Sequence, residues 1–117
     1  MFRSMLKSKI HRATITETVL GYEGSITIDS DLLTAADILP DEKVQVVNLH
    51  NGARFETYAI AGEPGSRIVC LNGPAARLGE PGDVVIVITY CLLDDAVAKA
   101  HKPIVVKVDT ENKIIPA

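Results

Sequence analysis

The most distinctive chemistry that this sequence allows lies at Gly24 and Ser25, inside the segment 21–29. A serine hydroxyl can attack the carbonyl carbon of the preceding residue and so move that acyl group from nitrogen to oxygen. Glycine on the carbonyl side offers little crowding and permits unusual backbone angles. Gly-Ser is also a common turn dipeptide, so the pair alone leaves an ordinary turn as the alternative.

Such a site could draw on three closely spaced side chains, Arg54, Thr57 and Tyr58. Arg54 has a fork of donors that suits a carboxylate, although a surface arginine is the alternative. Thr57 could donate to the Gly24 carbonyl, or simply be a β-former. Tyr58 could protonate a carbanion, or be an aromatic half-buried in the core. Neighbouring strand residues point to opposite faces, so we expect Thr57 and Tyr58 to share a pocket only through a bulge or between subunits.

A basic segment near the N-terminus adds candidates. Residues 5–16 alternate loosely between polar and apolar types, as in a partly exposed strand. A period of two puts Lys7, Lys9, His11 and Ala13 on one face, which is either a solvated edge or the wall of an anionic site. His11 could assist proton transfer or hold a substrate, but a lone histidine is more often surface or polar wall.

Short strands and tight turns are expected around these residues. Asp29 or Ser30 can cap a helix over 31–39, and Asn51-Gly52 predicts a hairpin between strands 43–50 and 53–61. The other expected elements are strands at 67–71 and 84–93, a helical turn at 73–78, a short helix at 94–101 and an edge strand at 104–108. The 84–93 run is apolar on both faces, which predicts cover on both sides. Six or seven short strands indicate a mainly β, closed barrel with short helices.

Composition narrows the function. A chain of 117 residues makes one small domain, and 4% aromatic residues with no Trp leave the core to aliphatic side chains. A net charge of −3 gives no basic footprint, which argues against a nucleic-acid partner. The N-terminus lacks a signal-peptide stretch and no run reaches membrane-spanning length, so we expect no membrane partner and a cytoplasmic location. Cys70 and Cys91 are expected to be reduced, buried thiols, and no metal-ligand spacing is present.

Four segments, 9–12, 21–29, 51–60 and 72–76, together resemble the self-processing, pyruvoyl-dependent aspartate 1-decarboxylases. The resemblance runs in one register over most of residues 1–93 and is weakest in the tail. It implies a double-psi β-barrel that assembles as a homotetramer with active sites between subunits. It also implies that the chain 1–117 is cleaved into residues 1–24 (β chain) and 25–117 (α chain), either spontaneously or with an accessory maturation factor.

The same resemblance implies the chemistry. Ser25 would become a covalent pyruvoyl cofactor, with no metal, and this group would form a Schiff base with L-aspartate. The products would be carbon dioxide and β-alanine for pantothenate and coenzyme A synthesis. The implied catalytic residues are Ser25 and Tyr58, and the implied processing residues are Gly24, Ser25 and Thr57. Substrate contacts are implied at Lys9, Arg54, Thr57, Gly73, Pro74 and Ala75, with His11, Tyr22 and Asn72 as further candidates.

Two alternatives stay open at this point. The chain could be a non-catalytic double-psi barrel that serves as an interaction module, since a fold does not fix a function. It could also be a pyruvoyl decarboxylase of another acidic amino acid, since one methylene gives only modest discrimination between substrates.

Overall fold

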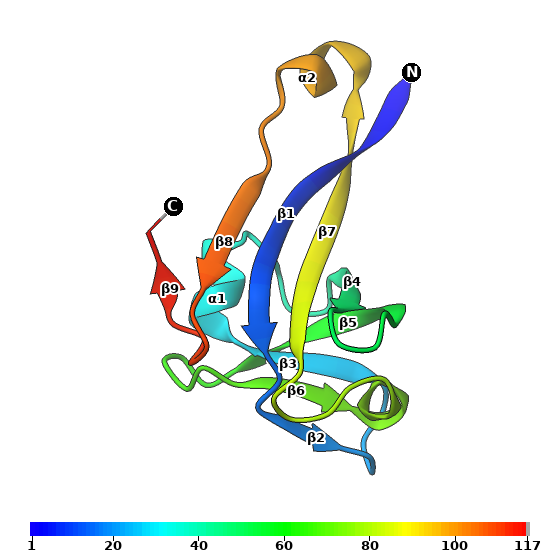
Figure 1. Ribbon diagram of the computed structural model, residues 1–117. Helices are drawn as coiled ribbons and strands as arrows, with labels where there is room; N and C mark the ends of the chain where they lie inside the picture. Colours follow the sequence, from blue (N-terminus) through cyan, green and yellow to red (C-terminus); the bar gives the residue numbers. More distant parts are fainter. Residues whose placement is uncertain (117) are drawn as a thin grey trace.

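Strands dominate the computed structural model, which describes residues 1–116 (Figure 1). The strands are β1 Phe2–Thr14, β2 Glu17–Val19, β3 Ser25–Asp29, β4 Lys43–Asn48, β5 Arg54–Gly62, β6 Val69–Asn72, β7 Val84–Asp94, β8 Ile104–Val108 and β9 Ile114–Ile115. The helices are α1 Ser30–Ala35, α2 Asp95–Ala100 and the 3₁₀ helix η1 Gly73–Arg77. The expected mainly β chain with short helices is therefore confirmed, with more strands than the six or seven predicted.

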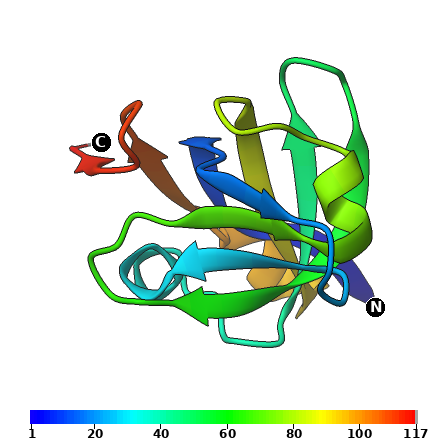
Figure 2. The same ribbon diagram turned by 90° about the horizontal axis from the view of Figure 1, so that it is seen from below.

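The strands form one mixed sheet in the order β2-β6-β3-β5-β4-β7-β1-β8-β9. Three neighbouring pairs are parallel, namely β1 with β8, β2 with β6, and β3 with β5. The sheet closes because β1 runs on into β2: the amide of Ile15 donates to Asp83 O at 2.8 Å and that of Thr16 to Val69 O at 2.8 Å. Seen from below, β3 lies between β5 and β6 (Figure 2). This closed sheet is the β-barrel that the resemblance implies.

The inner face of the barrel is aliphatic, as the scarcity of aromatic residues requires. Its largest fully buried apolar side chains are Ile10, Ile15, Ile26, Ile28, Val44, Val46, Val69, Leu71, Val85 and Val87. Strict alternation in β4 supplies Val44 and Val46 to this core while Gln45 stays half-exposed. Burial of these branched side chains is the main stabilising term of the fold.

Helix α1 is shorter than the 31–39 helix that the sequence predicted. Asp29 caps it, accepting a hydrogen bond from the Asp31 amide at 2.8 Å. The helix ends because Asp37 adopts a positive φ of 55° and the amide of Ile38 returns to Leu33 O at 2.9 Å. This 6→1 bond is the Schellman ending, which a left-handed residue makes possible.

Strand β1 departs from the regular alternation that the sequence suggested. Its register against β7 shifts between Leu6 and Ser8 and again between Ile10 and Ala13, and Arg12 has a φ of 68°. A bulge of this kind turns the following residues over. Ala13 is therefore buried with Ile10, and its predicted place on the outer face beside Lys9 and His11 is wrong.

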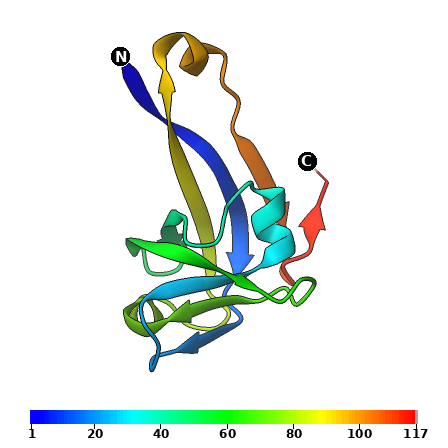
Figure 3. The same ribbon diagram turned by 180° about the vertical axis from the view of Figure 1, so that it is seen from behind.

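An arm formed by β1 and β7 extends beyond the barrel and carries α2 at its end (Figures 1 and 3). Phe2 and Leu92 on this arm are about 70% exposed. The expected cover on both faces of β7 is not found within one chain, because Val85 and Val87 are buried whereas Ile86 and Ile88 stay half-exposed.

The tail folds back along the barrel. Strand β8 has the bounds that the sequence predicted, but it is not an edge, because it pairs with β1 on one side and β9 on the other. Within residues 1–116, no helix is both long enough and apolar enough to cross a membrane.

Candidate functional site

The bond between Gly24 and Ser25 lies where a surface loop enters the sheet. Ser25 opens β3, is 1% exposed, and is the cross-strand partner of Asn72 at the end of β6. On its other side β3 runs parallel to β5, with Ile26 opposite Ala59. Continuing that register by one residue brings Ser25 beside Tyr58, so two predicted site residues meet here.

The side chain of Asn72 organises the polar contacts of Ser25. Its Nδ2 donates to Ser25 Oγ at 3.0 Å and to Thr27 Oγ1 at 2.9 Å. Its Oδ1 accepts a hydrogen bond from Cys70 Sγ at 3.3 Å. A longer contact of 3.5 Å links Ser25 Oγ to Glu23 O. The serine hydroxyl is thus held by an amide rather than by a strong base.

Thr27 and Cys70 are members of this site that the sequence analysis missed. A usable signal was present, because each lies two residues from a candidate on the same strand and therefore shares its face. Thr27 follows Ser25 in this way, and Cys70 precedes Asn72. The two residues are also direct cross-strand partners.

Two hollows flank the Gly24–Ser25 bond. The one on the serine side has a volume of about 300 Å³ and is lined by Tyr22, Glu23, Ser25, Thr27, Tyr58, Ile60 and Asn72. The one on the glycine side has a volume of about 330 Å³ and is lined by Gly24, Phe55, Glu56, Thr57, Tyr58, Pro74, Ala75 and Leu78. Tyr58 borders both hollows, and Thr57 borders the one at Gly24.

Thr57 and Tyr58 both border the second hollow of a single chain, and β5 has no bulge against β4 at this point. Tyr58 lies opposite Lys43 and Thr57 opposite Val44 in an unbroken register between β4 and β5. The pairing of β5 with β3 begins only at Ala59. The hollow therefore lies where the pairing of β5 with β3 begins.

The turn after β6 presses against the loop that carries the bond. Gly73 has a φ of +61°, and a Cβ there would overlap Tyr22 O and lie 2.7 Å from the Glu23 carbonyl carbon. A Cβ on Gly24 would lie 3.4 Å from Pro74 Cδ. Glycine at position 73 is thus required by both its backbone angle and the available space.

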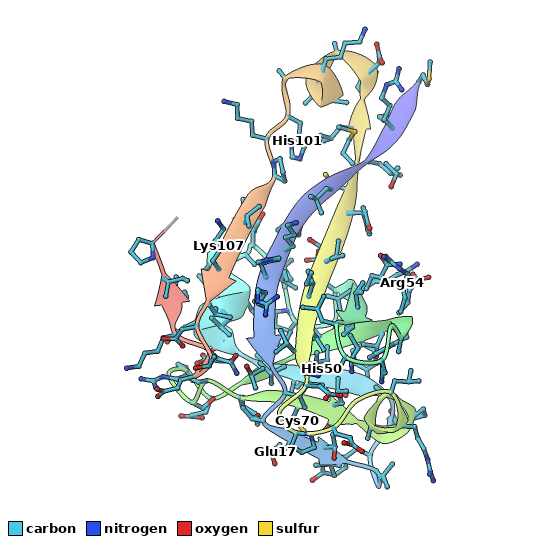
Figure 4. The ribbon with its side chains drawn as sticks, in the orientation of Figure 1. Glu17, His50, Arg54, Cys70, His101 and Lys107 are labelled. Carbon is cyan, nitrogen blue, oxygen red and sulfur yellow. The ribbon has the colours of Figure 1, made fainter. Side chains whose placement is uncertain are left out.

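Lys9, His11 and Arg54 lie elsewhere, on what we call the cationic face. Lys9 and His11 flank the inward-pointing Ile10 on β1 and so point out of the barrel, and neither they nor Arg54 line the two hollows. Arg54 Nη1 donates to Gln45 Oε1 at 2.9 Å, and Figure 4 shows the arginine at the side of the molecule, away from Cys70. The structure of one chain therefore does not bring these predicted substrate-binding residues to Ser25.

Cross-strand pairing connects Arg54 to strand β7 through strand β4. Arg54 is the partner of Val47, which is in turn the partner of Ile86 on β7. The carboxylate of Glu56, two residues further along β5, pairs with Lys43 at 2.7 Å. Among the described residues, no carboxylate forms an ion pair with the Arg54 guanidinium.

His11 has an unusual environment on this face. Its Nδ1 is buried and, within the described chain, has no hydrogen-bond partner. Burial lowers the pKa of its imidazole, and the nearby charges of Lys9, Arg12 and Lys107 lower it further. The lowered pKa favours the neutral ring near pH 7.

The cysteines of the chain are free thiols, and Cys70 is a protonated one. Burial raises the pKa of the Cys70 thiol, and Glu17 adds to the effect. Cys70 therefore keeps its proton and can act as a donor. Cys70 and Cys91 are free thiols. Among the described residues, no group of three or more His, Cys, Asp or Glu side chains is placed to hold a metal ion.

Comparisons with known proteins agree with one another. The model of the family described as "Aspartate decarboxylase" matches residues 1–115. Proteins named aspartate 1-decarboxylase are similar over nearly the whole chain. The one from Pelotomaculum thermopropionicum is 64% identical over 115 residues, which are 98% of this chain and 87% of the relative. Those from Thermoanaerobacter pseudethanolicus and Listeria monocytogenes are each 59% identical, over 97% of this chain and 97% and 90% of the relatives.

Proposed function

The chain belongs to the aspartate decarboxylase family, and from this premise we propose that it converts L-aspartate to β-alanine and carbon dioxide with a pyruvoyl group made from Ser25. The observation that supports this most directly is the environment of Ser25. The buried serine follows a glycine and lies between two hollows. Asn72 donates a hydrogen bond to it, and Thr57 and Tyr58 line the hollows. The β-alanine would serve pantothenate synthesis in the cytoplasm.

All the atoms of the group would come from this chain and water. Ser25 Oγ attacks the carbonyl carbon of Gly24, the C–N bond breaks, the hydroxyl proton passes to the leaving nitrogen, and the product is an ester of Gly24 with a free amine on Ser25. Loss of the Ser25 Cα proton then expels the Gly24 carboxylate and leaves a double bond between Cα and Cβ. Water replaces the nitrogen of this enamine, through its imine tautomer, and releases ammonia. Residues 1–24 end in a carboxylate and residues 25–117 begin with the ketone.

Thr57 and the loop at 22–24 would assist the first step. Thr57 lines the hollow beside Gly24, where its hydroxyl can donate to the carbonyl oxygen as negative charge develops. The close approach of Gly73 to Tyr22 O, the Glu23 carbonyl carbon and Gly24 N would restrict the backbone just before this carbonyl. Asn72 holds the attacking oxygen from the other side.

The surroundings of Ser25 fit a pyruvoyl group. Residue 25 would stay at the start of β3, where pairing with Asn72 keeps its position after cleavage. The adjacent hollow of about 300 Å³ is at the small end of ligand pockets, which suits an amino-acid substrate. A pyruvoyl group supplies a ketone that binds the substrate amine and withdraws electrons as carbon dioxide leaves. Tyr58, which borders the same hollow, would return a proton to the substrate carbon.

A second copy of the chain would complete the site. Aspartate retains its side-chain carboxylate, and such a group calls for cations such as Arg54 and Lys9. These lie on the cationic face, away from Ser25 of their own chain, so we propose that the cationic face of one subunit covers the Ser25 hollow of another within a homotetramer. The half-exposed Ile86 and Ile88 on the same sheet face support such burial.

Aspartate turnover by purified protein tests the proposal. The native chain should release carbon dioxide from L-aspartate and form β-alanine, while Ser25→Ala should stay one folded, inactive chain. Ser66→Ala, at an exposed serine in a turn, is the matched control and should keep full activity. Turnover of L-glutamate measured alongside decides the substrate. An active Ser25→Ala protein, or a preference for glutamate, would contradict the proposal.

A further inference from the structure

The amide of Asn72 is held at both ends, and Cys70 holds one of them. Both N–H groups are engaged, one by Ser25 and one by Thr27, so the carbonyl oxygen faces the other way, toward Cys70 Sγ at 3.3 Å. Cys70 is only 3% exposed and belongs to β6, the strand that ends at Asn72. The thiol therefore relies on protein acceptors, and Asn72 Oδ1 at 3.3 Å is nearer than the Leu71 carbonyl oxygen at 3.9 Å.

The chemistry of the thiol selects one orientation of that amide. Because burial keeps the proton on sulfur, Cys70 is a donor and favours the carbonyl oxygen of Asn72 on its side. In the reversed orientation, the N–H groups of Asn72 would point at the sulfur atom, which is a weak acceptor. The hydroxyl oxygens of Ser25 and Thr27, which are good acceptors, would then lose their N–H donors. The observed orientation therefore sends an N–H to Ser25 Oγ.

We propose that Cys70 is a positioning residue for self-processing: acting through Asn72, it fixes the Ser25 hydroxyl for attack on the Gly24 carbonyl. This rests on the proposed function. The N–H from Asn72 occupies one lone pair of Ser25 Oγ, which restricts the rotation of the hydroxyl. It also stabilises the negative charge that grows on this oxygen as its proton leaves. Without the thiol, the amide loses the donor that holds its carbonyl end.

Two substitutions at position 70 distinguish a positioning role from a packing role, because the two roles predict opposite rankings of the cleavage rates of the two variants. Cys70→Val fills the space without a donor, whereas Cys70→Ser keeps a donor on a smaller side chain. Freshly purified, uncleaved chains are incubated, and the fraction converted to residues 1–24 and 25–117 is followed by intact mass. We expect Cys70→Val to cleave about two- to tenfold more slowly than the native chain, the factor that one neutral hydrogen bond is worth, and Cys70→Ser to cleave near the native rate.

Several outcomes would overturn the role of Cys70. It fails if Cys70→Val cleaves at the native rate, or if Cys70→Ser is slowed as much as Cys70→Val. Should Cys70→Val not fold, Cys70→Ala removes the donor without adding volume, and the same comparison with Cys70→Ser applies.

A second readout needs no cleavage. In ¹⁵N-labelled protein, the side-chain amide protons of Asn72 should exchange slowly in the native and Cys70→Ser chains and faster in Cys70→Val. Unchanged protection in Cys70→Val would overturn the role of Cys70 whether or not the chain cleaves. A native chain that never cleaves would instead overturn the proposed function, so the two failures are distinguishable.

Discussion

Replacing Gly73 by alanine should disrupt the candidate site more than any comparable glycine change. The substitution costs about 1–2 kcal/mol for a Cβ in the left-handed region. The new Cβ would also overlap Tyr22 O and lie 2.7 Å from the Glu23 carbonyl carbon and 2.8 Å from Gly24 N. Because these are backbone atoms, relieving the overlap should cost a further 1–3 kcal/mol or so. A total of about 2–5 kcal/mol is a large share of the stability of a small domain.

Gly52→Ala is the matched control for this prediction. Gly52 has a similar φ of +74°, but a Cβ there meets no atom within 4 Å. Urea unfolding in a Ser25→Ala background, where every variant should remain one chain, measures both free energies of unfolding. When Ser25 is left unchanged, Gly73→Ala should also fail to cleave, because the added Cβ forces the loop at 22–24 to move. Gly52→Ala should cleave normally. Equal losses of stability for the two variants, together with normal cleavage of Gly73→Ala, would refute the reasoning.

Three further predictions concern single side chains. Tyr58→Phe should still cleave but lose about 10²- to 10⁴-fold in aspartate turnover, because the proton donor is gone; normal β-alanine formation by this variant would remove Tyr58 from that role. Asp29→Ala should lower the free energy of unfolding by about 2–4 kcal/mol, since its carboxylate accepts three backbone N–H bonds; an unchanged urea midpoint would count against this. The pKa of His11 is lowered in the folded chain, so the unfolded chain binds a proton more readily and stability should fall as pH drops through the usual histidine value of about 6.5. His11→Gln should flatten that dependence, and parallel curves for the two proteins would show that another group is responsible.

Local signals predicted the parts of the fold that local physics controls. Asn51-Gly52 indicated the hairpin, and β4 and β5 pair antiparallel around it because Gly52 can adopt a positive φ. Asp29 was one of two proposed helix caps and is the one used. The helix beyond it ends early because Asp37 adopts a left-handed conformation. Aspartate tolerates this conformation, but the residue type alone does not predict it.

Long-range contacts decided the rest. The bulge at residues 11–12 that buries Ala13 comes from pairing with β7, some seventy residues away in the chain, and no pattern within residues 5–16 specifies it. The contacts of Asn72 with Ser25 and Thr27 likewise depend on the pairing of β3 with β6. The resemblance identified Asn72 as a candidate, and the two-residue spacing on β6 could have added Cys70, but only the folded sheet brings Ser25 and Thr27 to the other end of the Asn72 amide.

Intact-mass analysis of the purified protein under denaturing conditions, before and after borohydride reduction, tests the central claim most directly. The account predicts two fragments, residues 1–24 with a free carboxylate at Gly24 and residues 25–117 with a ketone that gains two hydrogens on reduction. A single chain of residues 1–117 that persists after warm incubation, both alone and with cell extract to supply a maturation factor, would contradict it.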